Sequence, residues 1–278
     1  MIRFKGIIAV LMAAILGGGI FVSPATAADR LILPEGVYYH RFISMVNGPE
    51  ATWINPAGLG LYTAICTQVI GEYYDGEFAD NWGLNLTGEG IGIGYRRLRH
   101  FLGDDYREYI FGLGQKLSHG FYIGGSYLYI PEGPEGYHKK HLWNLGFILR
   151  ENPKYSIAAT FTNLNRSRVA GEKSDIEQVY SLTYIMDRNL IALSIEVSLS
   201  TGQSLSGASY NYGINIYPIK GTEIYASLDN DENFEIGARV NLTQYFLGLQ
   251  GRHRKGNRND ATSFYAGLVN GSQESLIK

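Results

Sequence analysis

Apolar and polar side chains alternate along most of the chain, with a period of two residues. In residues 191–198, for example, a long or branched aliphatic side chain occupies every second position, and small or polar side chains lie between. This alternation is typical of a β-strand with one apolar and one polar face. Segments of about ten residues with this pattern predict strands at 60–74, 81–87, 90–98, 107–117, 120–130, 140–150, 155–164, 176–186, 190–199, 208–217, 222–228, 233–241, 245–252 and 261–270.

The connections between the predicted strands differ in length in an ordered way. Short connections at 88–89, 118–119, 151–154, 187–189, 218–221 and 242–244 alternate with mostly longer, polar ones at 75–80, 99–106, 131–139, 165–175, 200–207 and 253–260. The connection at 229–232 is the one exception, because it is short at a position where the alternation predicts a long loop. Outer-membrane barrels have short turns on one rim and longer loops on the other, an order that the Greek-key links of a soluble sandwich do not follow. The pattern predicts an all-β, antiparallel transmembrane β-barrel of about 14 strands, with a secreted β-sandwich binding module as the weaker alternative.

The first residues carry the features of an export signal. Arg3 and Lys5 precede an apolar run at 6–22 and the cleavage-site sequence Ala25-Thr26-Ala27. The alternative is a retained membrane anchor. We expect a cleaved signal peptide at 1–27, an N-terminal segment at 28–59 in or near the lumen, the barrel at 60–270 and a polar tail at 271–278. The expected location is the bacterial outer membrane.

Composition narrows the class of protein. The chain has 278 residues, of which 45% are hydrophobic and only 18% charged, with 35 Gly and 21 Tyr. The mean hydropathy of -0.10 argues against a polytopic helical membrane protein, and the apolar fraction argues against disorder. A single Cys excludes an internal disulfide or a multi-cysteine metal site. The net charge of -2 gives no sign of nucleic-acid binding.

Aromatic residues gather near the predicted strand ends, at Tyr127, Tyr129, Trp143, Phe147, Tyr180, Tyr184, Tyr217, Tyr245 and Phe246. Amphipathic rings at such positions fit the two interfacial belts of a membrane barrel. The general preference of tyrosine for β-sheets is the other explanation.

The sequence from Ala51 to Gly60 resembles the N-terminal segment of FadL-like outer-membrane proteins, and its motif is Asn55, Pro56, Ala57, Gly58 and Leu59. That superfamily includes long-chain fatty-acid transporters and PorV-type secretion components. The resemblance implies a 14-stranded barrel with an N-terminal segment tucked inside. A second stretch, Tyr109 to Ser118 followed by Phe121 to Tyr129, is similar to barrel domains that precede a signal-peptide-peptidase-like protease in some bacterial chains.

Two features bear on how far this resemblance extends. The chain ends at Gln273 to Lys278 without the terminal aromatic residue usual in outer-membrane proteins, so the tail is either a linker to a periplasmic domain or a frayed end. The segment 28–59 is shorter than the plug of a fatty-acid transporter, which argues against fatty-acid transport. Within it, we expect residues 38–46 to form a short helix inside the barrel mouth.

Few residues suggest chemistry. The glycine-rich run Gly88 to Gly94 is not followed by a helix, so we expect its glycines to face a crowded barrel interior rather than a nucleotide. His138 and His141 lack a carboxylate partner for a metal site, and no glycine-flanked nucleophile occurs. We therefore predict no catalytic, cofactor-binding or metal-binding residue. The basic residues of 96–100 and 252–255 bind lipopolysaccharide phosphates or form a solvated rim.

Four charged residues are expected to face the lumen: Glu196, Glu223, Glu235 and Arg239. Both a water-filled channel and a plugged, hydrogen-bonded barrel place such residues inside. The leading hypothesis is a non-enzymatic outer-membrane barrel that transports or shuttles a hydrophobic or secreted substrate. The alternative is the membrane-anchoring barrel of a larger protease or secretion assembly. Expected partners are outer-membrane lipid or lipopolysaccharide and a hydrophobic small molecule or secretion partner, without nucleic acid or cofactor.

Overall fold

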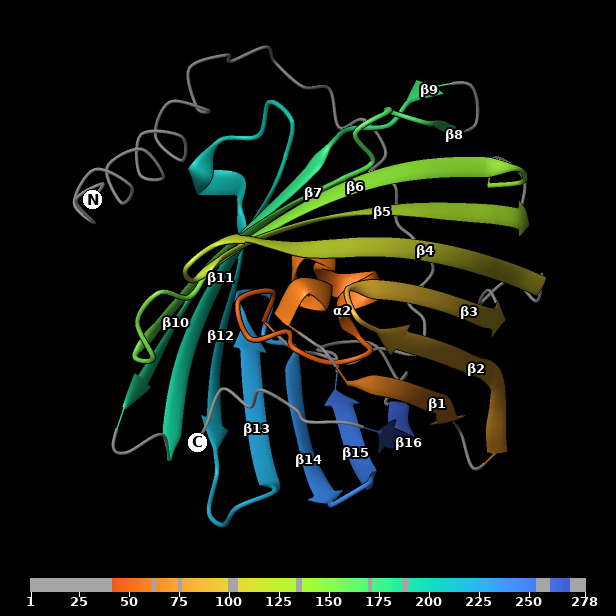
Figure 1. Cartoon of the computed structure of the whole chain (residues 1–278). Helices are drawn as coiled ribbons and strands as arrows, with labels where there is room; N and C mark the ends of the chain where they lie inside the picture. Colours follow the sequence, from red (N-terminus) through yellow and green to blue (C-terminus); the bar gives the residue numbers. More distant parts are fainter. Residues whose placement is uncertain are drawn as a thin grey trace.

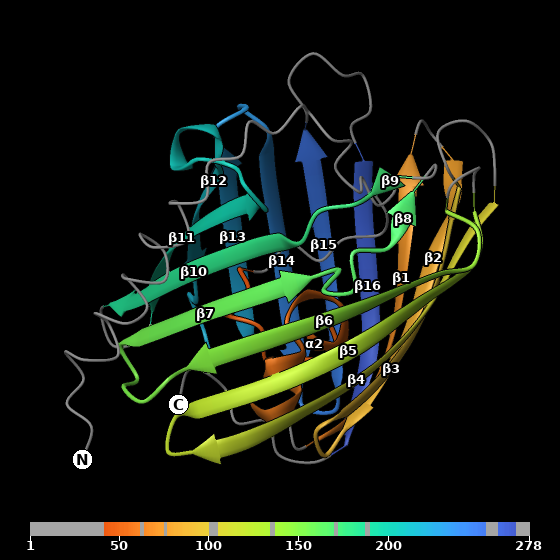
Figure 2. The same cartoon turned by 90° about the horizontal axis from the view of Figure 1, so that it is seen from above.

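The chain folds into a closed barrel of antiparallel strands (Figures 1 and 2). The computed structural model describes residues 42–61, 64–74, 77–99, 105–133, 137–169, 172–186, 190–253 and 261–270. The first barrel strand, β1 (Ile65–Tyr74), pairs with the last, β16 (Ala261–Asn270), and thereby closes the ladder. The other barrel strands are β2 (Glu77–Gly88), β3 (Ile91–Arg99), β4 (Asp105–Ser118), β5 (Phe121–Glu132), β6 (Lys140–Leu149), β7 (Tyr155–Thr162), β10 (Glu177–Met186), β11 (Ile191–Ser200), β12 (Ser209–Ile216), β13 (Thr222–Asp229), β14 (Phe234–Leu242) and β15 (Tyr245–His253).

The predicted fold class is confirmed, because each barrel strand overlaps one of the predicted strands. The start of the first strand was wrong: it begins at Ile65, and residues 56–61 form the 3-10 helix η1 (Pro56–Leu61). Pro56 has a fixed φ and lacks an N–H, which suits the first position of a helical turn. The loop at 165–175 also contains a small hairpin, β8 (Arg168–Val169) and β9 (Glu172–Lys173), that the alternation did not predict. No described helix is long and apolar enough to cross a membrane.

The alternation of the sequence separates the two faces of the barrel wall. Outward-facing aliphatic side chains are about half exposed, as for Ile93 at 52% and Leu247 at 54%, whereas the inward-facing Gln68 and Glu108 are fully buried. A soluble protein does not cover its surface with large aliphatic side chains in this way. Apolar side chains outside and polar ones inside are the arrangement of a barrel surrounded by lipid.

Most of the predicted belt residues face outward. Trp143 and Tyr245 are more than half exposed on the outer surface. Phe246 and Tyr217 are exceptions, and their assignment to a belt was wrong. The Phe246 side chain points into the barrel, where it covers Gly267 on the neighbouring strand, and the Tyr217 hydroxyl donates a hydrogen bond to the lumen carboxylate of Glu223 (3.4 Å).

Beyond the end of the β6–β7 ladder, the wall is completed by the loop that follows β7, in part through the side chain of Asn165. The β6–β7 ladder ends at Leu145↔Phe161. The half of β6 nearer the long-loop rim is bonded to the loop that follows β7. The backbone N–H of Trp143 donates to Oδ1 of Asn165 (3.1 Å), and Nδ2 of Asn165 donates to the carbonyl of His141 (2.6 Å). The carboxamide of Asn165 thus replaces a peptide group of a missing strand.

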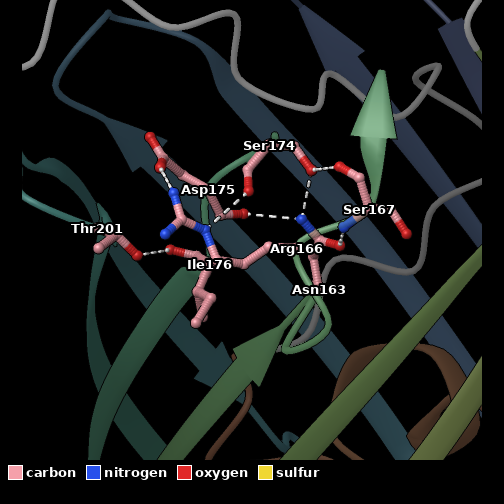
Figure 3. Close-up of polar contacts among 7 residues, drawn as sticks. All are labelled: Asn163, Arg166, Ser167, Ser174, Asp175, Ile176 and Thr201. Carbon is pink, nitrogen blue, oxygen red and sulfur yellow. Dashed lines mark hydrogen bonds and ion pairs between the residues drawn. The ribbon is translucent and has the colours of Figure 1, made fainter. Parts of the chain in front are cut away.

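A polar cluster holds the same loop in place (Figure 3). The guanidinium of Arg166 forms an ion pair with Asp175 (3.3 Å). Nδ2 of Asn163 donates to the carbonyl of Asp175 (2.9 Å), and Oδ1 of Asn163 accepts from the backbone N–H of Ser167 (2.9 Å). Asn163 and Arg166 both have positive φ, at 58° and 48°, so the loop turns sharply twice. These contacts fix Asn165 against β6.

Substitution of Asn165 by Ala removes both contacts to the β6 backbone. We expect faster amide hydrogen exchange at residues 141–143 and a free energy of unfolding lower by about 1 kcal/mol. Asn165→Asp retains the acceptor and loses the donor, so its effect should be intermediate. Hydrogen-exchange mass spectrometry of the folded protein in lipid nanodiscs measures this, with residues 209–229 as an internal control. Unchanged exchange at 141–143 in Asn165→Ala would contradict this role.

Candidate functional site: the lumen and its docked N-terminal segment

Residues 42–61 lie inside the barrel (Figure 1). Helix α2 (Ala51–Ile54) contacts β3 and β4, and η1 contacts β4, β5 and β6. The helix expected at 38–46 is wrong in its described part, because residues 42–46 form a turn in which Met45 N–H donates to the carbonyl of Phe42 (2.7 Å). The Asn47-Gly48-Pro49 sequence that follows disfavours regular structure. Residues 38–41 lie outside the described part of the chain.

The motif Asn55 to Leu59 is entirely buried at the centre of this segment. Nδ2 of Asn55 donates to the carbonyl of Ile43 (3.1 Å) and to that of Phe147 on β6 (3.3 Å), while its Oδ1 accepts from the N–H of Ala57 (3.1 Å). One carboxamide therefore joins two parts of the segment to the barrel wall. A hydrophobic residue at this position would leave these buried backbone groups without that partner.

Glycines of β3 to β6 form the surface on which the segment is docked. A Cβ atom at Gly92 would overlap Thr52, one at Gly146 would overlap Asn55, and one at Gly124 would overlap the backbone of Pro56. The segment approaches the strands at a distance that only glycine permits. The expectation that the glycine-rich run 88–94 faces a crowded interior therefore agrees with the contacts of Gly92.

A polar network joins the segment to the wall on the long-loop side of these glycines. The guanidinium of Arg96 lies 3.8 Å from the centroid of the Trp53 ring and forms a 2.6 Å ion pair with Glu108, which is almost completely buried. The Trp53 indole N–H donates to Oδ1 of Asn85 (2.5 Å), and Nδ2 of Asn85 donates to Gln68 (2.8 Å). Because every charge here has a partner, burial of this ion pair is tolerated.

Arg96 shows what the sequence analysis missed. The prediction that it belongs to a basic run at the rim is wrong, because its side chain lies in the lumen, whereas that of its neighbour Arg97 lies outside and is paired with Asp105. The period of two would have revealed this, because Arg96 shares its face with Gly92 and Gly94. In the second basic run, Arg252 contacts Glu72 in the wall (3.6 Å). His100, Arg254 and Lys255 lie outside the described residues.

The first residues of the segment are attached to the opposite side of the lumen. The backbone N–H of Ile43 donates to Oε2 of Glu196 on β11 (3.0 Å). The Ser44 hydroxyl lies 2.7 Å from those of Ser181 and Thr183 on β10, and the carbonyl of Ser44 accepts from Arg150 (2.8 Å). The segment is thus bonded across the barrel, at β2–β6 on one side and β10–β11 on the other.

The four charged residues expected in the lumen all project inward, but they do not form one cluster. Glu196 holds the N-terminal segment, as described above. Glu223 and Arg239 are directly opposite on β13 and β14, where Glu223 accepts from Asn215 (2.8 Å). Arg239 stacks on the Phe246 ring at 4.5 Å, and Glu235 accepts from Gln250 (3.2 Å). The side chains of this sector of the wall form a hydrogen-bonded polar network.

An apolar layer lies on the long-loop side of the Trp53–Arg96 network. It consists of inward-facing side chains of β3 to β6, all at most 3% exposed: Leu98, Tyr106, Leu128, Ile130 and Leu142. Each lies two or four positions beyond a polar or glycine residue that faces the network, in the direction of the long loops. The lumen therefore has a polar sector on β10–β14 and an apolar layer on β3–β6.

The described residues include no group of three or more His, Cys, Asp or Glu side chains placed to hold a metal ion. His141 lies on the outer surface, where its ring stacks on that of Tyr129 with centroids 4.8 Å apart. Cys66 is fully buried in the apolar cluster of the lumen. The described side chains of the lumen can offer a ligand apolar contact and hydrogen bonds.

Substitution of Gly124 by Val should displace the docked segment, since the new side chain would occupy the position of the Pro56 backbone. The matched control is Gly125→Val on the outer face, where the nearest atom to an added Cβ is 3.7 Å away. We expect amide exchange of residues 50–61 to rise at least tenfold in Gly124→Val, which corresponds to about 1.4 kcal/mol, and to stay unchanged in Gly125→Val. Equal exchange in both variants would show that docking does not depend on this contact.

No protein-family model and no curated protein matches the sequence. Solved structures with a similar fold include the Acinetobacter baumannii outer-membrane protein Omp33, with a TM-score of 0.51 and 11% identity over 75% of this chain and 99% of that one. The CymD monoaromatic hydrocarbon channel has a TM-score of 0.54 and 9% identity over 82% of this chain and 94% of that one. At these identities the likeness concerns the fold. The chain has the fold of an outer-membrane β-barrel.

Proposed function

We propose that the protein is a non-enzymatic barrel of the bacterial outer membrane that passes a small hydrophobic molecule, with the N-terminal segment 42–61 as its gate. The observation that carries this proposal is the apolar layer of Leu98, Leu128, Ile130 and Leu142 inside the barrel, next to the docked segment. A general porin needs a polar lumen to conduct water and ions. Trp53 and Ile54 of the segment pack against the buried cluster that contains this layer. Apolar surface uncovered there when the segment moves would suit a ligand that leaves water as it enters.

The proposal agrees with the resemblance to FadL- and PorV-like proteins. Asn55 to Leu59 lies inside the barrel, as the resemblance implies, and organises the docked segment through the Asn55 carboxamide. The similarity in fold to CymD, a monoaromatic hydrocarbon channel, also makes a small apolar substrate a reasonable choice. Within the same scheme, a secreted partner that binds at the rim is the alternative substrate.

A second candidate function is that of a membrane-anchoring barrel in a larger protease or secretion assembly. The observation in its favour is the attachment of the segment to two sides of the lumen, through Trp53 and Arg96 on one side and through Ser44 and Glu196 on the other. A barrel whose lumen is permanently closed by this segment could anchor an assembly in the membrane but could not transport a substrate. The two functions differ in whether the segment must move.

Membrane residence is tested first. Because a closed barrel in lipid resists unfolding by detergent at room temperature, the full chain should fractionate with the outer membrane and migrate faster on a gel before heating than after. Extraction should require detergent. Recovery of the protein from the periplasm without detergent would contradict the proposal, and it would favour a secreted binding module.

Movement of the segment is tested with a removable tether. The Ser44 and Ser181 hydroxyl oxygens are 2.7 Å apart, so Ser44→Cys with Ser181→Cys, in a Cys66→Ser background, places two thiols within reach of a disulfide. The probe is 1-N-phenylnaphthylamine, a hydrophobic dye that an intact outer membrane excludes. Oxidation should reduce dye entry to the rate of cells that lack the protein, and a reductant should restore it.

The single variant Ser44→Cys in the same background is the control, and its dye entry should not respond to the oxidant. Dye entry that persists in the oxidised double variant would contradict gating by this segment. A wild-type protein that does not raise dye entry above that of cells lacking it would contradict transport and favour the anchor.

A further inference from the structure

The outer surface of β3 and β4 carries two arginines at an unusual place. Arg97 and Arg107 are directly opposite in the ladder and both face away from the lumen. Like charges opposite one another on adjacent strands destabilise a sheet unless an anion lies between them. Here Asp105 lies between: Nη2 of Arg97 donates to both of its carboxylate oxygens (3.0 and 3.1 Å), and Nη2 of Arg107 is 3.9 Å away. We call Arg97, Asp105, Arg107 and Glu132 the arginine patch.

The patch is accessible, and Arg107 retains capacity for further contacts. The side chains of Arg97 and Arg107 are 34% and 37% exposed. Arg107 reaches its two carboxylates through Nε and Nη2, at 3.2 Å from Glu132 and 3.9 Å from Asp105. A guanidinium offers five N–H donors in a planar fork, so this fork is only partly used. Ion pairs at such exposure contribute little to stability and exchange partners easily.

Below the patch, the same two strands change character in two steps. First comes an aromatic pair, in which the Tyr95 and Tyr109 rings have centroids 5.0 Å apart. Trp82 on the neighbouring strand β2 lies at the level of the patch, opposite Arg97, and its ring centroid is 5.1 Å from that of Tyr95. Beyond the tyrosine pair lie Ile93 and Phe111, which are about half exposed. Charged residues, tyrosines and then the apolar side chains of Ile93 and Phe111 thus follow one another from the long-loop rim toward the middle of the wall.

This order matches the profile of one lipid molecule. Tyrosine and tryptophan rings lie at the level of the headgroups, and aliphatic side chains contact the acyl chains. The arginines are then at the depth of the headgroup itself. Bidentate pairing of arginine with phosphate is among the strongest polar contacts in proteins, and two facing arginines fit a headgroup that carries more than one phosphate.

We propose that the outer face of β3 and β4 binds a phosphorylated glycolipid of the outer leaflet, with Arg97 and Arg107 on its phosphates, Tyr95 and Tyr109 beside its headgroup, and Ile93 and Phe111 along its acyl chains. This inference rests on the proposed membrane residence, since the long-loop rim of an outer-membrane barrel faces the outer leaflet. It does not depend on transport. When the phosphates bind, they replace part of the contact that Asp105 now makes with both arginines.

The experiment uses the full chain in phosphatidylcholine nanodiscs, with diphosphoryl lipid A as the probe and native mass spectrometry as the measurement. Arg97→Ala with Arg107→Ala should weaken binding about tenfold or more, because charge-assisted hydrogen bonds are lost. Lys154→Ala with Lys220→Ala is the matched control: both lysines are exposed on the short-turn rim, and the change in charge is the same. This control should bind as the wild type does.

Two further measurements make the assignment specific. Asp105→Asn removes the competing carboxylate and should strengthen binding a few-fold. Monophosphoryl lipid A should bind more weakly than the diphosphoryl form, and inorganic pyrophosphate at the same concentration should not displace the lipid. Equal binding by the arginine double variant and its control, or displacement by pyrophosphate alone, would overturn the proposal.

Failure of this inference is distinguishable from failure of the proposed function. Heat-modifiable migration of each variant shows whether the barrel is folded, independently of lipid A. A folded double arginine variant that keeps its dye entry and loses lipid A binding supports the lipid site. A folded wild type that binds no lipid A overturns the lipid site and leaves the transport proposal standing.

Discussion

Closure of the ladder between β1 and β16 is the constraint on which the rest of the structure depends. The register runs without interruption from Ile65↔Asn270 to Tyr74↔Ala261. In lipid, every backbone N–H and C=O group must be bonded within the protein, and only a sheet without edges achieves this with strands. The same requirement explains Asn165, whose carboxamide bonds the backbone of β6 where β7 has ended.

Closure also creates an interior that must be filled. Along β13 to β16, aromatic side chains do this by covering glycines on the next strand, as Tyr225 covers Gly237 and Tyr265 covers Gly248. Along β3 to β6, the wall is lined by glycines and the N-terminal segment takes the space. The inward-facing glycines are therefore covered in two ways: by aromatic side chains of the neighbouring strand, or by the N-terminal segment. The candidate gate is the part of the interior that is filled by the N-terminal segment and not by side chains of the barrel strands.

Arg96 and Arg97 are adjacent in the sequence, but their side chains lie on opposite faces of the barrel wall. Arg96 points inward and stabilises the docked segment through Trp53 and Glu108, whereas Arg97 points outward and joins Asp105 and Arg107. The pleat of a strand places successive side chains on opposite faces. The buried, paired Arg96 holds the docked segment, and the partly exposed Arg97 at the rim belongs to the proposed lipid site. The number of basic residues in a run does not distinguish these positions, but the alternation of side chains along the strand does.

The period of two in the sequence predicted the strands, their number and the inward position of Glu196, Glu223, Glu235 and Arg239, because the face of each side chain is a local property of an extended backbone. Turn residues predicted most of the connections for the same reason. The tertiary structure alone revealed that Asn55 bonds β6, that Arg96 stacks on Trp53 and that Arg97 faces Arg107. Each of these contacts joins residues far apart in the chain or on strands whose relative register is decided by the closed ladder, and no local pattern encodes that register.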